Sequence, residues 1–121
     1  MKKWLIMIGI ILVLGGGFLT YKLLTNDELK NTKWQVTSWK IDYLDPTIAD
    51  ITLNFNKNKE VSGNGGVNGY GGKYGLGKNG KLVFLEITST EMASVNEEIN
   101  TNESMYFYLL SEVKYYELYN N

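Results

Sequence analysis

The chain has 121 residues and contains no cysteine, histidine or arginine. It therefore cannot form disulfides, thiolate nucleophiles, cysteine-held iron–sulfur clusters or imidazole-ligated metal sites. Three of its 12 lysines precede residue 25, which leaves nine lysines against 13 acidic residues and a net charge of −4 in the remainder, and this argues against nucleic-acid binding.

The first predicted element is a membrane anchor over residues 1–24. Residues 4–21 carry no charge, and at helical rise they span roughly 27 Å, close to the thickness of a hydrocarbon core. Trp4 and Tyr21 would lie at the two interfaces, where aromatic rings are favoured. A short basic tail before an apolar run is the usual export arrangement, so we predict a single-pass protein whose domain lies outside the cell.

The same residues allow a second interpretation, a cleaved signal peptide. Lys2 and Lys3 would form its basic region, residues 5–14 its apolar region, and the glycines at 15–17 the small residues near the cut. The mature protein would then be secreted. A lipid-modified cysteine is excluded because the chain has none.

Residues 25–31 are polar and charged, and we predict that they form a linker. From Thr32 onward the pattern is β-like. Apolar residues alternate in one phase up to Val36 and in the opposite phase from Trp39, which predicts a bulge near residues 37–38.

Three strands are predicted in the middle of the chain. Residues 51–55 alternate between apolar and polar and give the clearest half-buried strand, and a short strand follows at 60–62. Residues 63–80 contain nine of the 13 glycines, so the backbone there can adopt positive φ or approach a neighbour closely. An Asn-Gly hairpin signal then leads into a strand over 81–87.

Apolar residues over 95–113 recur every three or four positions, which predicts a helix, and the aromatic-rich residues 114–119 predict a final strand. The predicted fold class is α+β. It consists of a small, mostly antiparallel sheet or partial barrel with one helix packed on it, preceded by one transmembrane helix.

Two ordered motifs carry a family resemblance. The first is V-S-G-N-G-G-V-N-G-Y-G-G-K-Y at 61–74, and the second is I-T-S-T-E-M-A-S at 87–94. Together with Trp34 before them and Glu103 after them, they resemble the META domain, the HslJ-like family. A META-like domain is therefore expected over residues 32–121. The motif residues carried over as structural are Gly63, Gly65, Gly66, Asn68, Thr90 and Met92.

The resemblance implies a protein of the cell envelope or secreted space that is linked to stress tolerance and has no established catalytic chemistry. Relatives carry cysteine at the positions of Val67 and Ser94, so the bond implied by the family cannot form here. Relatives also continue into further strands. A truncated domain with an exposed sheet edge is therefore expected, and such an edge invites pairing with another chain.

Three aromatic residues, Trp39, Tyr70 and Tyr74, are candidate ligand-binding residues, because exposed rings can stack on glycans or peptide side chains. The alternative is that they belong to the core. The glycine-rich stretch 63–72 lacks the Lys-Ser/Thr ending of a phosphate-binding loop, so we interpret it as a tight turn.

Acidic residues suggest two further sites. The spacing of Asp42, Asp45 and Asp50 does not match a calcium-binding loop, so we interpret them as part of a solvated turn. Glu86 and Glu91 flank a Thr-Ser-Thr segment, and paired carboxylates can act as acid and base.

The predicted function is non-catalytic, either binding or structural support in the envelope. It needs no cofactor or metal, and its partners are the bilayer through residues 4–21 and an envelope protein or a glycan. One alternative is a small envelope hydrolase that uses Glu86 and Glu91. Another is docking of a partner protein by strand addition at the open sheet edge.

Overall fold

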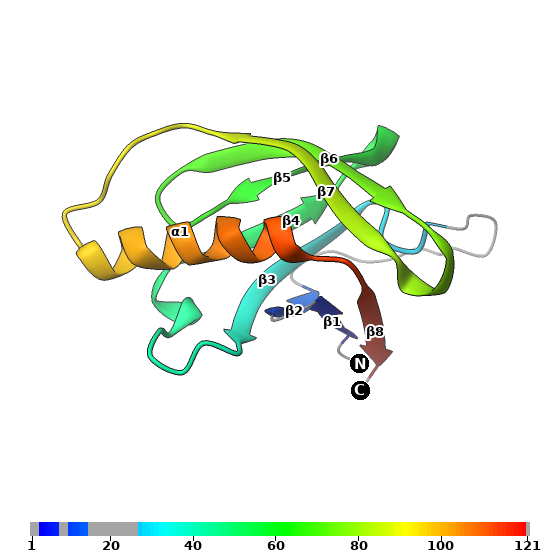
Figure 1. Cartoon of the computed structure of the whole chain (residues 1–121), viewed down its shortest axis with the longest axis horizontal. Coiled ribbons are helices and arrows are strands. Elements are labelled where there is room, and N and C mark those ends of the chain that lie inside the picture. The colour runs from blue at the N-terminus through cyan, green and yellow to red at the C-terminus, as the bar shows by residue number, and fades with distance from the viewer. Residues whose placement is uncertain (1–2, 8–9, 15–26, 121) are drawn as a thin grey trace.

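The computed structural model describes residues 3–7, 10–14 and 27–120 (Figure 1). This part of the chain contains one α-helix and eight strands. The strands are β1 (Lys3–Met7), β2 (Ile10–Leu14), β3 (Thr32–Trp39), β4 (Thr52–Phe55), β5 (Glu60–Asn64), β6 (Gly69–Leu76), β7 (Leu82–Ser89) and β8 (Tyr116–Asn120), and the helix is α1 (Glu97–Glu112).

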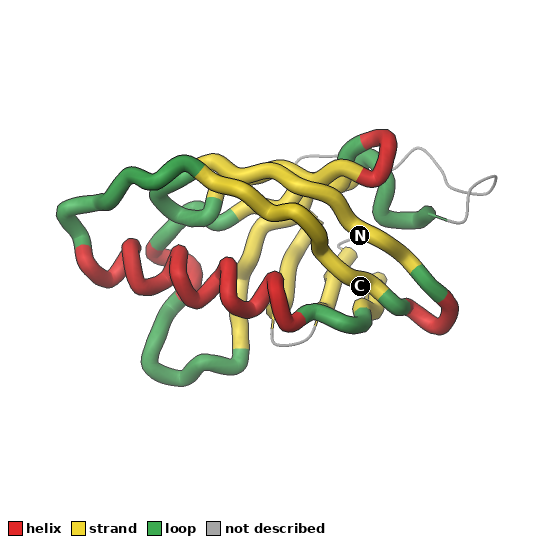
Figure 2. The backbone as a smooth tube through the Cα atoms, turned by 45° about the horizontal axis from the view of Figure 1, so that its top comes forward, coloured by secondary structure: helices red, strands yellow, loops and turns green. Residues whose placement is uncertain are grey.

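The strands form one antiparallel sheet in the order β7-β6-β5-β4-β3-β2-β1-β8. Strands β3 to β7 follow one another as a meander, whereas β1 and β2 lie between β3 and β8. The sheet curls, and its two outer strands meet where the Leu82 amide donates to the Lys114 carbonyl at 2.9 Å and Lys81 pairs with Tyr115 (Figure 2). The prediction of an antiparallel sheet with one packed helix is confirmed.

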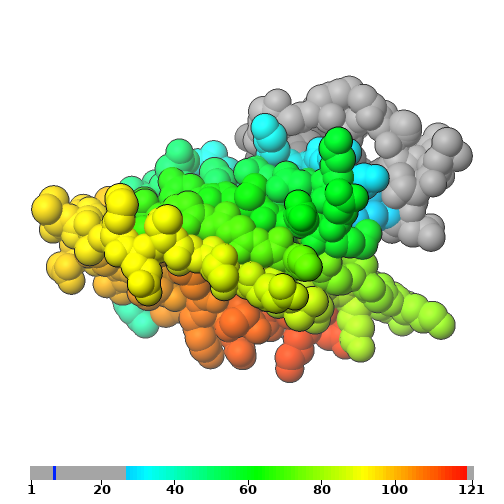
Figure 3. Space-filling view, turned by 90° about the horizontal axis from the view of Figure 1, so that it is seen from above, coloured from blue at the N-terminus to red at the C-terminus, as the bar shows by residue number. Residues whose placement is uncertain are grey.

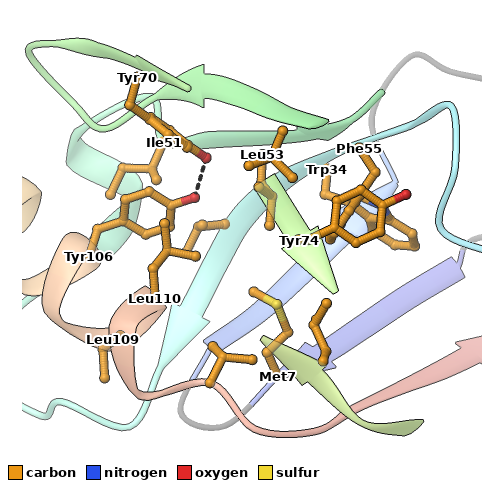
Figure 4. Packing of buried hydrophobic residues seen from close by; sticks show 14 of the residues in the cluster. Met7, Trp34, Ile51, Leu53, Phe55, Tyr70, Tyr74, Tyr106, Leu109 and Leu110 are labelled. Atoms are coloured by element: carbon orange, nitrogen blue, oxygen red, sulfur yellow. Dashed lines mark hydrogen bonds between the residues drawn. The ribbon is translucent and has the colours of Figure 1, made fainter. Parts of the chain in front are cut away.

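The core lies between the inner face of the curved sheet and α1. Leu53 and Phe55 point inward from β4, and Tyr106 and Leu110 enter the same core from α1 (Figure 4). The helix begins after Asn96, whose side chain accepts hydrogen bonds from the first free amides of the helix. Inward apolar positions thus alternate along the strands and recur with helical period in α1.

The predicted bulge in the first strand of the domain is confirmed. Ser38 pairs with Ile11 and Val36 pairs with Leu12, so Thr37 is the extra residue of β3. The inserted residue reverses the phase of the inward side chains between Val36 and Trp39.

The apolar N-terminal segment, on which the transmembrane helix is predicted, is described only in part. Its described parts, Lys3–Met7 and Ile10–Leu14, are strands, and residues 8–9 and 15–26 lie outside the described residues. A continuous apolar run has no periodicity that separates a buried strand from a helix, and β-branched residues favour the strand. Within residues 3–7, 10–14 and 27–120, no helix is long and apolar enough to cross a membrane.

Most of the predicted linker is part of the domain. Leu29 is fully buried in the core, and the Asp27 carboxylate accepts hydrogen bonds from the amides of Leu29 and Lys30. Residues 25 and 26 lie outside the described residues. The glycine-rich region also holds a full strand, β6, which the sequence pattern did not predict.

Candidate functional site

The first motif is fastened to α1 by a buried carboxylate. Glu103 accepts hydrogen bonds from the backbone amides of Val67 at 2.9 Å and Asn68 at 2.6 Å, and from the Asn68 side-chain amide at 2.6 Å. Glu103 and Asn68 are both buried. The carboxylate therefore fixes the glycine-rich loop against the helix, because each of these bonds has a charged acceptor.

The same asparagine fastens the second motif. The Asn68 amide oxygen accepts from the Thr90 hydroxyl at 2.8 Å and from the Met92 amide at 2.8 Å, and its nitrogen donates to the Met92 carbonyl at 2.9 Å. The side chain thus uses two donors and two acceptor sites, its full capacity. The two motifs lie side by side, as the resemblance implies.

The three motif glycines allow close packing around this network. A Cβ atom at Gly63 would lie 2.2 Å from the Thr52 carbonyl oxygen, and one at Gly65 would lie 2.7 Å from the Phe107 ring. Gly66 has φ of +128°, which side-chain-bearing residues rarely adopt. These glycines, with Asn68, Thr90 and Met92, therefore act in holding the fold.

The three candidate aromatic ligand-binding residues lie in the core. Trp39, Tyr70 and Tyr74 are 9%, 7% and 2% exposed, so their faces are not open to a stacking ligand. The Trp39 indole donates to the Leu44 carbonyl at 3.0 Å, and the Tyr70 hydroxyl donates to the Thr52 carbonyl at 2.7 Å. A small domain without disulfides needs such large rings for its core.

Tyr70 and Tyr106 place a hydroxyl pair inside the core (Figure 4). Burial raises the pKa of both phenols above the ordinary value for tyrosine. Both rings are therefore neutral at physiological pH. Because Tyr70 donates to Thr52, the hydroxyl of Tyr106 is the donor within the pair, and the chain of bonds ties α1 to β6 and β4.

Tyr74 belongs to a polar cluster at the start of the domain. Its hydroxyl donates to Asp27 at 2.6 Å, and the Lys59 ammonium lies 2.9 Å from the same carboxylate. Burial by itself raises the pKa of Asp27, but the hydrogen bonds from Tyr74, Lys59 and the Leu29 amide together outweigh it and lower this pKa. The cluster joins the first described residues of the domain to β6.

The acidic candidates do not assemble. Asp45 accepts from the amide and hydroxyl of Thr47, and Asp50 accepts from the Gln35 side chain. Asp42 is exposed. Among the residues with described positions, no group of three acidic side chains gathers closely enough to hold a metal ion.

The two glutamates of the hydrolase alternative are both exposed. Glu86 lies 3.9 Å from the Lys73 ammonium, a loose surface pair. Glu91 follows the end of β7, and no hydrogen bond brings the two carboxylates together within the described part of the chain. No observation on the described residues gives the pair the shared, shaped site that acid–base chemistry requires.

Sequence reasoning missed an open groove on the outer face of the sheet, across β4, β5, β6 and β7. Its volume is about 760 Å³, and it is shallow and wide open to solvent. Figure 3 looks down on this part of the molecule, where β5 and β6 are drawn in green. Its residues occupy outward positions of four strands, and only the register of the sheet brings them together. The lining residues are Thr52, Asn54, Ser62, Gly63, Asn64, Gly69, Tyr70, Gly71, Thr88, Ser89 and Thr90.

Comparison with known proteins identifies one relationship. The family model of the META domain matches residues 27–121, which is most of the chain. The match begins at Asp27, the residue whose carboxylate joins the start of the domain to β6. No curated protein and no solved structure matches the chain.

Proposed function

The chain belongs to the META domain family, and from this premise we propose that it is a non-catalytic protein of the cell envelope, exposed on the outer side of the membrane, which acts by binding or by structural support. A link to stress tolerance, which the family resemblance implies, is part of the proposal.

The observation that supports a non-catalytic role is that the motif side chains make hydrogen bonds that hold the fold together. Glu103 and Asn68 are buried, and together with the exposed Thr90 they form a hydrogen-bond network that joins the loop, the strand end and the helix. A carboxylate that accepts three hydrogen bonds inside the fold is committed to structure. One surface available for interaction is the outer groove, whose lining carries polar but uncharged groups.

Placement at the membrane is supported by the uncharged residues 4–21 and the lysines that precede them. Residues 3–7 and 10–14 form strands of the sheet that pair with β8 and β3, and the same residues cannot keep this pairing and span a bilayer as a helix. The proposal therefore requires that this segment leaves the sheet when it enters the membrane.

The placement is tested in cells that produce the full chain with a C-terminal epitope tag. We expect the tag in the membrane fraction after an alkaline carbonate wash, and we expect protease added to intact cells to remove it. Full-length protein in the cytosol would contradict the proposal. A shortened product in the medium would instead identify the cleaved signal peptide.

One observation favours a second candidate function, the docking of a partner by strand addition. Strands β1 and β2 lie outside the residues matched by the family, yet they fill the place between β3 and β8. When this segment is in the membrane, the facing edges of β3 and β8 have no neighbour and become acceptors for strands of another protein. Cross-linking in intact cells would then give a discrete protein adduct.

A further inference from the structure

A row of small residues crosses the outer groove from strand to strand. Asn54 of β4 pairs with Ser62 of β5, Ser62 pairs with Gly71 of β6, and Gly71 pairs with Thr88 of β7. Residues that pair across neighbouring strands point to the same face of a sheet. An amide, a hydroxyl, a bare stretch of backbone and a second hydroxyl therefore follow one another along the row, with about 4.8 Å between neighbours.

A second row runs parallel to the first. The Asn64 amide donates to the Thr52 hydroxyl at 3.0 Å, Asn64 pairs with Gly69, and the Thr90 amide donates to the Gly69 carbonyl at 3.3 Å. Each member lies two residues along its strand from a member of the first row, so the rows are about 7 Å apart. Both rows have glycine on β6.

The fold does not require glycine at these two positions. A Cβ atom at Gly71 would lie 3.5 Å from its nearest neighbour, and one at Gly69 would lie 3.8 Å away, both ordinary contacts. Neither residue has a positive φ. By contrast, a Cβ at Gly72 would lie 2.5 Å from the Ile87 side chain. Glycine inside a strand weakens it, and it often marks a bulge, a bend or a place where a ligand or another backbone approaches closely.

The groove also has hydrogen-bonding groups to spare. In the part of the chain that the structure describes, the side chains of Asn54 and Thr88 have no hydrogen-bond partner, and Ser62 only accepts, from Asn56. No lining residue is charged. Hydroxyl and amide groups both donate and accept, which matches a ligand whose own groups do the same.

We propose that this groove binds a neutral oligosaccharide, whose hydroxyl groups bond to the polar residues of the two rows while a sugar ring lies over Gly69 and Gly71. The inference rests on the binding role proposed above and gives it a ligand class. Four strands span about 14 Å across the groove, which suits several linked sugars better than one. An anionic ligand would find no cation among the lining residues.

Titration of the purified full chain by NMR tests the inference. The probes are maltohexaose, cellohexaose and chitohexaose, with a heparin hexasaccharide as the anionic comparison, in a detergent whose head group is not a sugar. We expect at least one neutral probe to shift the backbone amides of Gly69, Gly71 and Thr88 and the side-chain amide of Asn54, while the heparin probe does not.

Two variants remove the site in different ways. Gly71→Val fills the floor, and Thr88→Val keeps the shape but removes a hydroxyl; each should weaken binding about tenfold or more. Gly75→Ala is the matched control, because it lies on the same strand outside the groove and its Cβ meets Val83 at 3.4 Å. It should bind as the parent does.

The inference is overturned if no neutral probe shifts these amides, if the heparin probe binds more tightly, or if folded Gly71→Val and Thr88→Val proteins both bind normally. Such results leave the membrane placement untouched, because placement is measured in cells and not by binding. Conversely, a protein that is found in the cytosol but still binds a neutral probe at Gly71 would refute the membrane placement and support the inference that the groove binds neutral oligosaccharides.

Discussion

Glu103 is the single residue on which the packing of α1 against the glycine-rich loop depends most. Replacing it with glutamine puts an NH₂ group or a neutral oxygen where a carboxylate now accepts three hydrogen bonds. Bonds to charged groups contribute about 1.5–3 kcal/mol, so we expect Glu103→Gln to lower the free energy of unfolding by about 2–3 kcal/mol in urea denaturation.

The matched control is Glu112→Gln at the end of the same helix. Glu112 is exposed, and removing a negative charge from a helix C-terminus is neutral or slightly favourable. Its effect should stay within about 0.5 kcal/mol. Equal losses in the two variants would show that the buried network contributes nothing specific.

Asp27 makes the stability of the start of the domain depend on pH. Its pKa is lower in the folded chain than the ordinary 3.8. A carboxyl with a depressed folded pKa contributes stability above the unfolded pKa and loses it as pH falls through the folded value. The stability advantage of the parent over Asp27→Asn should therefore be full near neutral pH and shrink below about pH 4.

Thermal unfolding of both proteins over this pH range measures the effect. Tyr74→Phe serves as an intermediate variant, because it removes one of the hydrogen bonds that lower the pKa of Asp27 and keeps the others. It should show a weaker pH dependence than the parent. A difference between parent and Asp27→Asn that is the same at every pH would refute the assignment.

Among the elements, β7 is the edge strand that most needs protection from unwanted pairing. The register of β7 against β6 shifts between Gly71 and Lys73 of β6, so Glu86 and Ile87 of β7 together face Gly72. Glu86 also has a positive φ of 53°. A bulge with a charged residue is a known way to blunt an edge. The left-handed conformation costs a side-chain-bearing residue about 1–2 kcal/mol, which glycine avoids.

Glycine relieves this strain but loses more conformational entropy on folding than glutamate does. The difference between the two effects leads us to expect that Glu86→Gly raises the free energy of unfolding by about 0.5–1 kcal/mol. The control is Glu60→Gly, an exposed strand residue with φ of −105°, where glycine should destabilise. Chemical denaturation of the two variants compares them directly. Stabilisation by both, or by neither, would mean that the backbone at Glu86 is not strained.

Regular elements with a clear period were predictable from the sequence. The strand expected at 51–55 is observed at Thr52–Phe55, and the helix expected at 95–113 is observed at Glu97–Glu112. The phase change between Val36 and Trp39 located the bulge. In each case a side-chain pattern of period two or 3.6 reflects which side chains face the core.

Strand β6 was missed because its outward positions are glycine and lysine rather than strand-forming residues. Its inward positions, Tyr70, Gly72, Tyr74 and Leu76, do alternate, and the two buried tyrosines were a usable signal. The outer groove was not predictable for a different reason. Its residues come from four strands, and only the register of the sheet brings them together.

At the scale of the whole molecule, the N-terminal segment has two mutually exclusive places, the sheet and the bilayer. In the sheet, Leu12 of β2 pairs with Val36 of β3. The chain has no cysteine, so Leu12→Cys with Val36→Cys introduces its only two thiols. Paired residues on neighbouring strands lie within disulfide range. We expect the pair to oxidise readily in lipid-free solution and its yield to fall when lipid vesicles are present.

Lipid lowers the disulfide yield only if the N-terminal segment binds to the vesicles more strongly than it binds to the sheet. A ligand that binds two states of a protein equally well does not change their populations. The control pair is Leu12→Cys with Leu85→Cys. Leu85 belongs to β7, which is not a neighbour of β2, so this pair should stay reduced in both conditions. Equal oxidation of the first pair with and without vesicles would make β1 and β2 permanent strands of the sheet, and the domain would then need another route to the membrane.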